Sequence, residues 1–415
     1  MDEPERNRLN TSTEESRPQS GVESKVLQPA TLVARAGLGP SEQDGMLNTA
    51  VYRASTIVYP TVQSYKDRHD GFYDDVVYGL YGTKTTYALA RAVQALEGAN
   101  STLIVSSGTA ANAISMSTFV ESGDHLLVAD CVYGTTRKFA DTVLTRFGVE
   151  VSYFDPGVGA DIRDEIRPNT RAIFIEAPGS QLFEMIDVPA IVEVARKAGV
   201  ITLMDNTWAS PLHFRPLDVG IDVSIQAGTK YLSGHSDVML GTISASKREH
   251  YELLKDMAGR MGNCAGPDEC YLVHRGLRTL DVRMDRHVRN AAILVDWLLA
   301  QPEVSKVLYP ALEVDPGYAL WKRDFKGASG LFGVRMRGMS RAAEDAFFNH
   351  LNLFKMGSSW GGYESLIVPA WPLPQRSRRS LDKNESLLRV HAGLEDPADL
   401  IDDLNAAFVR MRRAV

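Results

Sequence analysis

The chain has little cysteine, no basic excess and no long apolar run, and each shortage excludes a class of protein. Its 415 residues include three cysteines, Cys131, Cys264 and Cys270. These are too few and too unevenly spaced for a disulfide framework or a four-ligand zinc site. No run approaches the about 18 apolar residues of a membrane span, and the first residues lack the apolar core of a secretory signal. We therefore expect a cytoplasmic protein with reduced thiols.

The charge balance indicates what kind of partner the chain binds. Lys and Arg number 45 against 52 Asp and Glu, which gives a formal net charge of −7. Nucleic-acid-binding proteins normally carry a basic excess, so we expect neither nucleic acid nor membrane as a partner. The composition, 44% hydrophobic and 23% charged, is that of an ordinary globular protein. Small-molecule chemistry is the better expectation.

The length and the pattern along the chain predict several regions. Single cores rarely grow beyond roughly 250–300 residues, so two packed units are expected. Residues 1–28 are polar and aperiodic and are predicted to be a disordered tail, and residues 29–82 form an irregular arm with turn signals. In residues 83–280, short strand-like runs alternate with helical segments, which is typical of a largely parallel sheet covered on both faces. A long amphipathic helix predicted over 275–301 leads into a smaller C-terminal domain, residues 281–415.

Ligands of such sheets sit at the carboxyl ends of the strands, where this chain carries polar chemistry. Lys230 follows the strand-like "DVSIQAG", and a desolvated lysine there can attack carbonyl carbons. A surface lysine is the ordinary alternative. Asp205 ends "VITLMD" and could pair with a protonated pyridine nitrogen, or simply cap a helix.

Two further segments are candidates for holding a cofactor. In "SSGTAANA" a strand turns into a helix, and the N–H groups of Gly108 and Thr109 could bind a phosphate; an ordinary capped helix is equally compatible. Tyr133 in "DCVYGTT" could stack on an aromatic ring or serve only in packing.

Two other patterns are interpreted as structural. His235 and Asp237 lack a nearby third ligand, so no metal site is predicted. The basic run "QRSRRS", residues 375–380, is interpreted as a solvated loop, because the protein as a whole is acidic.

Several motifs together resemble a known family. They are "EAPGS", "DNTW", "GTKYLSGHSD", "RGLRTL", "WKRDF", "SWGGYESLI" and "RVHAGLED". Their number and order, from Thr31 to Arg410, are similar to the cystathionine β-lyases of the Cys/Met-metabolism family of pyridoxal 5′-phosphate (PLP) enzymes. The resemblance implies an α/β, fold-type I PLP-dependent transferase fold: a mostly parallel seven-stranded sheet domain plus a smaller α+β C-terminal domain.

The resemblance also implies roles at the cofactor. Lys230 matches the lysine that carries PLP, Asp205 the partner of the pyridine nitrogen, and Tyr133 the ring stacked on the cofactor. Residues that match phosphate contacts are Gly108, Thr109, Thr229 and, reaching in from a neighbouring subunit, Tyr78.

For the substrate, Arg389 matches the clamp on the α-carboxylate, where a guanidinium gives bidentate geometry. Taken without the family, Arg389 would more often be a surface residue. Ser359 matches a position near the same carboxylate, and Tyr133 also contacts substrate. Lys230 or Tyr133 would protonate the leaving sulfur, and the sequence does not choose between them.

One position departs from the family and one feature concerns assembly. Leu80 stands where many relatives have arginine as a phosphate ligand, which puts that contact in doubt, although Tyr81 or Lys84 could compensate. The arm of residues 29–82 is expected to contact a neighbouring subunit. The implied assembly is a homotetramer built as a dimer of active dimers.

The implied activity is α,β-elimination of an amino-acid thioether, L-cystathionine, to homocysteine, pyruvate and ammonia. The alternatives are a β-lyase of other cysteine S-conjugates or a cysteine desulfhydrase, and a γ-lyase or γ-synthase of the same family. The last alternative is a PLP-binding regulator without turnover.

Overall fold

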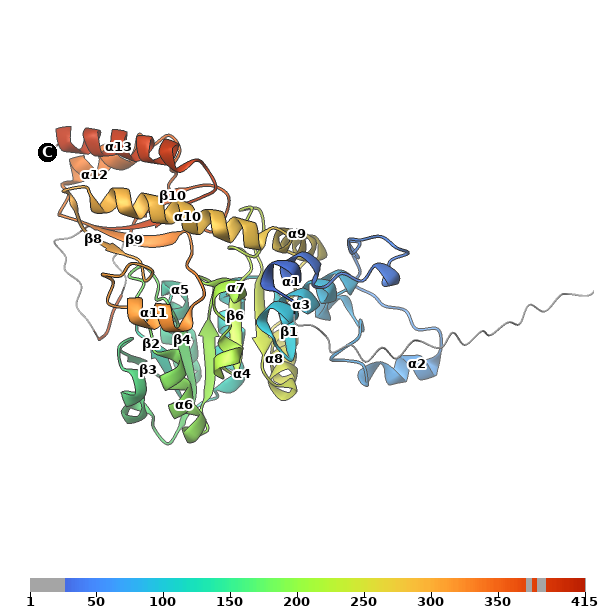
Figure 1. The fold of residues 1–415 in the computed structure, drawn as a ribbon. Coiled ribbons are helices and arrows are strands. Elements are labelled where there is room, and N and C mark those ends of the chain that lie inside the picture. The colour runs from blue at the N-terminus through green and yellow to red at the C-terminus, as the bar shows by residue number, and fades with distance from the viewer. Residues whose placement is uncertain (1–26, 371–374, 379–385, 415) are drawn as a thin grey trace, which may run out of the picture.

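The computed structural model describes residues 27–370, 375–378 and 386–414. Residues 1–26 of the predicted tail lie outside the described residues. The chain forms two sheets, one of seven strands and one of four. In Figure 1 the larger sheet lies below the smaller one, and the N-terminal arm extends away from both.

The larger sheet has the strand order β1-β7-β6-β5-β4-β2-β3. The contiguous strands from β3 to β6 pair in parallel, whereas β7 is antiparallel to both β1 and β6. This is the mostly parallel seven-stranded sheet that was expected. The strands are β1 Ser101–Val105, β2 His125–Ala129, β3 Glu150–Phe154, β4 Thr170–Glu176, β5 Ile201–Asp205, β6 Val223–Ala227 and β7 Gly241–Ala245.

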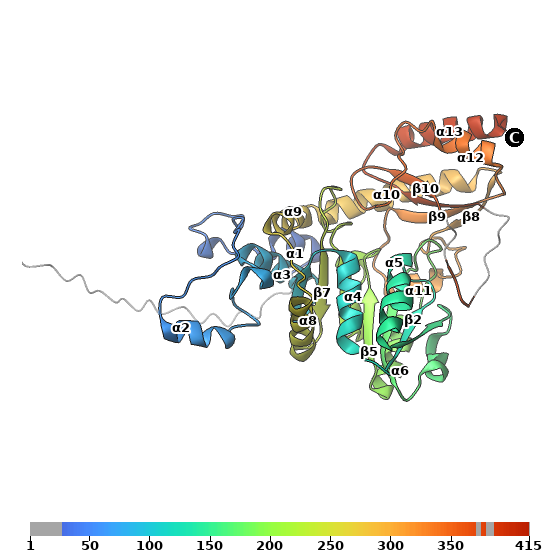
Figure 2. The same ribbon diagram turned by 180° about the vertical axis from the view of Figure 1, so that it is seen from behind.

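Helices cover both faces of this sheet. Figure 2 shows α4 and α5 in front of it, and Figure 1 shows α6 on the opposite face. The helices up to the end of this unit are α1 Pro29–Arg35, α2 Val62–Lys66, α3 Lys84–Glu97, α4 Gly108–Phe119, α5 Gly134–Phe139, α6 Val188–Ala198, α7 Ser210–His213, α8 Arg248–Arg260 and α9 Pro267–Leu277.

Side-chain caps determine where helices α4 and α3 begin. The Ser107 side chain accepts a hydrogen bond from the Ala110 N–H, so α4 begins directly after β1. Thr83 and Thr86 form a reciprocal capping box that begins α3, and Gly98, at φ +66°, ends it. The short connection after β1 brings the N-terminus of α4 to the carboxyl end of that strand.

The smaller sheet is antiparallel, with the order β10-β11-β9-β8. Helix α10 runs from the larger unit across this sheet (Figure 1). The remaining elements are α10 Leu280–Leu299, β8 Val304–Leu308, α11 Tyr318–Asp324, β9 Leu331–Met336, α12 Arg341–Phe348, β10 Leu366–Pro369, β11 Ser386–His391 and α13 Pro397–Arg413.

The single helix predicted over 275–301 is wrong, because the chain breaks between α9 and α10. The Arg283 guanidinium donates hydrogen bonds to Gly276 O, at 2.8 Å, and to Thr279 Oγ1, at 3.0 Å. It therefore binds the Gly276 carbonyl at the end of α9, a group that a continuous helix would satisfy internally.

The apolar core is continuous from the larger sheet to the smaller one. The domain boundary at residues 280 and 281 stays a prediction. In the described part of the chain, no helix is long and apolar enough to cross a membrane.

Candidate active site

A cavity of about 320 Å³ lies at the carboxyl ends of the larger sheet and collects most of the residues that the sequence singled out. Each sheet supplies part of the wall, and β11 contributes Arg389. The expected residues that line the cavity are Gly108, Thr109, Tyr133, Asp205, Thr229, Lys230, Ser359 and Arg389.

Lys230 lies in the turn after β6, with its amine inside the cavity. Its Nζ donates a 2.7 Å hydrogen bond to Ser359 Oγ and lies 5.3 Å from the centre of the Trp360 ring. Burial, and secondarily the charge of Arg389, lower the pKa of Lys230 to about 8, while Asp205 opposes the shift. The amine is thus neutral more readily than an exposed lysine.

Asp205, the last residue of β5, is held by its neighbours. Its Oδ1 accepts from the N–H and the hydroxyl of Thr207, at 3.0 and 2.5 Å. Its Oδ2 accepts from Asn112 Nδ2 at 3.0 Å, and the same amide donates to Thr136 Oγ1 at 3.0 Å. Asp205 is therefore a fixed hydrogen-bond acceptor rather than a helix cap.

Glu176, at the end of β4, was missed in the sequence. It pairs in register with Asp205 and also lines the cavity. Its Oε2 accepts the Tyr133 N–H at 2.7 Å. Burial first and the charge of Asp205 second raise the pKa of Glu176 well above its usual range. Glu176 thereby fixes the backbone of Tyr133, whose ring is exposed.

The start of α4 packs tightly on the end of β6. A Cβ at Gly108 would lie 2.5 Å from the Ala227 Cβ, so glycine is required for this approach. Thr229 accepts from the Leu240 N–H at 3.0 Å, which fixes the turn before Lys230. The N–H groups that begin α4 thus come next to that turn.

Arg389 enters from the smaller sheet. Its Nη2 donates to the carbonyls of Gly357 and Ser359, at 2.8 and 3.1 Å. Burial lowers the pKa of Arg389 from its usual value. The guanidinium is held at the cavity wall by backbone carbonyls, and no carboxylate of the described residues forms an ion pair with it.

The remaining predicted positions lie elsewhere. Tyr78, in the arm, is 49% exposed and does not line the cavity. The His235 ring contacts the Ser233 carbonyl, and no group of three or more potential metal ligands occurs among the described residues.

The described residues of "QRSRRS" are 375–378, which we call the strap. Gln375, Ser377 and Arg378 are exposed, as expected of a solvated loop, but the interpretation is wrong for Arg376. The Arg376 side chain is only 3% exposed and forms an ion pair with Glu184. Arg378 pairs with Glu165 at 2.5 Å. Residues 379 and 380 lie outside the described part. The carboxylates of an acidic protein attract a basic segment of the same chain. Composition alone does not reveal which carboxylates these are.

The donor set of the cavity fits PLP. A lysine amine of lowered pKa can bind its aldehyde, a fixed carboxylate can pair with its ring nitrogen, and N–H groups of a helix start can bind its phosphate. Asn112 was not anticipated, although its spacing of four residues from Gly108 places it on the same face of α4.

Comparisons with known proteins identify the family of the chain. Residues 30–409 match the family described as Cys/Met metabolism PLP-dependent enzyme. The chain is 41% identical to the cystathionine β-lyase MetC of Escherichia coli, over 92% of this chain and 98% of the relative. It is 40% identical to an L-alanine/L-glutamate racemase of Wolbachia pipientis, over 93% of this chain and 98% of that relative.

Among solved structures, metB from Corynebacterium glutamicum superimposes with a TM-score of 0.86 at 32% identity, covering 92% of this chain and 98% of that one. The likeness extends through both sheets. The chain therefore belongs to the Cys/Met-metabolism family of PLP-dependent enzymes.

Proposed function

We propose that this enzyme is a carbon–sulfur β-lyase that converts L-cystathionine and water to homocysteine, pyruvate and ammonia. The observation that carries the proposal is the meeting of Lys230, Asp205 and Arg389 in one cavity. The choice of L-cystathionine as substrate is based on relatives such as the E. coli enzyme, which is named a cystathionine β-lyase.

Lys230 is the proposed catalytic base. A buried amine with a pKa of about 8 is partly neutral at neutral pH, so it can accept the proton on Cα of the substrate. Its 2.7 Å contact with Ser359 Oγ orients it. Lys230 and Tyr133 both remain candidates for protonating the leaving sulfur.

Other residues would hold the cofactor. PLP, when bound, supplies an electron sink for the bonding electrons that the departing proton leaves behind. Asp205, fixed by Asn112, would hold the ring nitrogen protonated. Tyr133 would stack on the ring, and the phosphate would be bound by Gly108, Thr109 and Thr229.

Arg389 would bind the substrate α-carboxylate together with Ser359. Backbone carbonyls already orient its guanidinium at the cavity wall. A carboxylate arriving there gains a charge-assisted pair with a residue that needs little reorganisation.

We also propose a homotetramer in which Tyr78 completes the phosphate site of a neighbouring subunit. The support is its exposed position on the arm, away from the cavity of its own chain. The free thiols Cys131, Cys264 and Cys270 support the proposed cytoplasmic location.

One alternative has a specific observation in its favour. The Wolbachia relative, named a racemase, is as similar as the lyase from E. coli. Racemisation also requires proton transfer at Cα, so the same lysine would serve it. γ-Elimination, cleavage of other cysteine S-conjugates and PLP binding without turnover are the further alternatives.

The test is product identification by mass spectrometry after incubating the PLP-loaded protein with L-cystathionine. Pyruvate with homocysteine is expected, and Lys230→Ala is expected to lower kcat by at least about 100-fold. 2-Oxobutyrate with cysteine would instead indicate γ-elimination. Parallel incubations with L-alanine, followed by chiral chromatography, and with S-methylcysteine test the racemase and S-conjugate alternatives. Normal turnover by Lys230→Ala would contradict the proposed base.

A further inference from the structure

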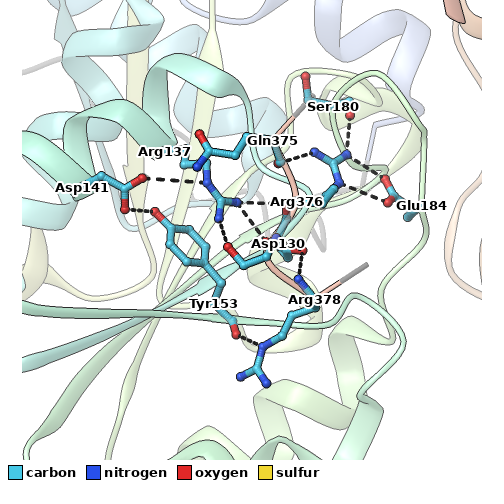
Figure 3. A network of polar contacts seen from close by, with 10 residues as sticks. Asp130, Arg137, Asp141, Tyr153, Ser180, Glu184, Gln375, Arg376 and Arg378 are labelled. Atoms are coloured by element: carbon cyan, nitrogen blue, oxygen red, sulfur yellow. Dashed lines mark hydrogen bonds and ion pairs between the residues drawn. The ribbon is translucent and has the colours of Figure 1, made fainter. Parts of the chain in front are cut away.

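The strap contacts the larger unit at two places. Figure 3 shows Arg376 directed to Ser180 and Glu184, and Arg378 beside Asp130 and Tyr153. In sequence the strap falls between β10 and β11, which end at Pro369 and begin at Ser386. It therefore belongs to the connection between these two strands, the second of which carries Arg389.

One contact fixes the strap itself. The Asp130 carboxylate, 1% exposed, pairs with Arg137 at 2.9 Å. It also accepts three hydrogen bonds of 2.8 to 2.9 Å from the backbone N–H groups of Ser377 and Arg378. A buried carboxylate satisfied in this way gives a well-defined position to the backbone next to Arg376.

The second contact is made by Arg376. Its Nη2 donates to Ser180 O at 2.9 Å and to Glu184 Oε2 at 3.1 Å, and its Nε donates to Glu184 Oε1 at 3.3 Å. With the arginine side chain 3% and the glutamate 16% exposed, this pair is shielded from water. Hydrogen bonds between charged groups contribute more than neutral ones, and more still where water is excluded.

Ser180 and Glu184 lie near the two ends of a tight loop, Gly179–Glu184, that forms one wall of the cavity. Its members Gly179, Ser180, Gln181 and Phe183 line that cavity. Gln181 and Phe183 have φ of +69° and +55°, a conformation that costs side-chain-bearing residues free energy. A backbone hydrogen bond from the Gly179 N–H to the Glu184 carbonyl, at 2.8 Å, closes the loop. Arg376 adds contacts from outside near both of its ends.

We infer that Arg376 is a positioning residue that holds the Gly179–Glu184 wall in the shape that binds the amino-acid substrate. It touches neither the reacting atoms nor the lysine, so it acts on substrate binding through the loop. The inference rests on the proposed function only for its choice of substrate.

The experiment compares Arg376→Met, Arg376→Lys and Arg378→Met in the PLP-loaded enzyme. Arg378→Met is the matched control, because it removes a guanidinium from the same strap but keeps the backbone N–H that binds Asp130. Amino-acid binding is read from the change in cofactor absorbance on titration with L-alanine, which requires no turnover. KM and kcat for L-cystathionine and the melting temperature are measured alongside.

For Arg376→Met we expect the Kd for L-alanine and the KM for L-cystathionine to rise about tenfold, with kcat changed less than about threefold. Cofactor content and absorbance should equal those of the parent. Arg376→Lys should recover part of the affinity, and Arg378→Met should stay within about twofold of the parent.

Unchanged amino-acid binding in Arg376→Met would overturn the inference, as would an equal loss of binding in Arg378→Met. If Arg376→Met does not fold, Glu184→Gln, which removes the other charge of the pair, should raise the same Kd in the same direction. A parent that binds L-alanine but does not cleave L-cystathionine would contradict the proposed function, while the Kd comparison would still decide the role of Arg376.

Discussion

Among single residues, Lys230 has the environment that most determines its reactivity. Burial and Arg389 lower its pKa to about 8, against about 10.4 for an ordinary lysine. In the cofactor-free protein, we expect acetylation of Lys230 by acetic anhydride to rise with pH around a midpoint near 8. Peptide mass spectrometry over pH 6 to 11 measures this, with the exposed lysines as internal controls. A Lys230 midpoint no lower than that of those lysines would contradict the role assigned to burial.

Asn112 should matter for holding the cofactor. It is 3% exposed, and its amide is shared between Asp205 and Thr136. Replacing it by leucine leaves the Asp205 carboxylate with one fewer donor, so we expect the Kd for PLP to rise about tenfold. Titration of the cofactor-free protein with PLP measures this.

The control for Asn112→Leu is Ser115→Ala in the same helix. Ser115 is fully buried, and its hydroxyl has no hydrogen-bond partner among the residues that the structure describes. Its removal should therefore leave PLP affinity unchanged. Equal losses in both variants would mean that α4 responds to any buried substitution and that Asn112 has no particular role.

Lys230 and Asp205 could be found in the sequence because each lies at or just after the end of an apolar strand, and parallel strands end at one edge of a sheet. Glu176 carries the same signal, because it ends the apolar strand β4, and it was overlooked. Asn112 lies inside α4, and its contact with Asp205 depends on packing between elements that no single segment encodes.

Among elements, those with strong hydrophobic periodicity can be predicted from the sequence. Those whose position depends on contacts with distant parts of the chain are missed. Strand β7, "GTISA", was overlooked because Gly, Ser and Ala favour strands weakly, although all five residues are buried between β1 and β6. The strap was misjudged because its partners lie about 190 to 250 residues earlier in the chain.

Glu97, the last residue of α3, contacts β6 and makes the stability of the protein depend on pH. Glu97 is fully buried and accepts a 3.0 Å hydrogen bond from Gln226 Nε2. Burial is the main cause that raises its pKa from 4.5 to about 7. Because the folded state holds this proton more tightly than the unfolded state, stability falls as pH rises from about 4.5 to 7, by about 3 kcal/mol.

Glu97→Gln keeps the acceptor for Gln226 and removes the titration. The melting temperature of the variant minus that of the parent should therefore increase as pH rises from 5 to 8, and most of this increase should occur below pH 7.5. Differential scanning calorimetry at several pH values measures the difference. A difference that is constant with pH would show that Glu97 is charged in the folded protein.

On the scale of the whole molecule, the arm is notable for its exposed apolar side chains. Val58, Val62 and Tyr65 are 86%, 72% and 53% exposed, which is unusual for large apolar side chains in one segment. The arm is nevertheless anchored, because Lys255 Nζ donates to the carbonyls of Phe72 and Tyr73 at 2.7 and 3.1 Å. An anchored apolar surface of this kind fits a neighbouring subunit.

If Tyr78 completes a neighbour's site, two defective variants should restore each other. Lys230→Ala lacks the amine but supplies Tyr78, whereas Tyr78→Ala lacks the tyrosine but keeps the amine. A mixed dimer of the two has one site with both residues and one with neither. When they are co-expressed with different tags and purified through both, we expect turnover several-fold above the mean of the two parents. Each variant purified alone through its own tag is the control. Turnover equal to that mean would place Tyr78 outside the neighbour's site, because a residue acting only within its own chain cannot be supplied by another.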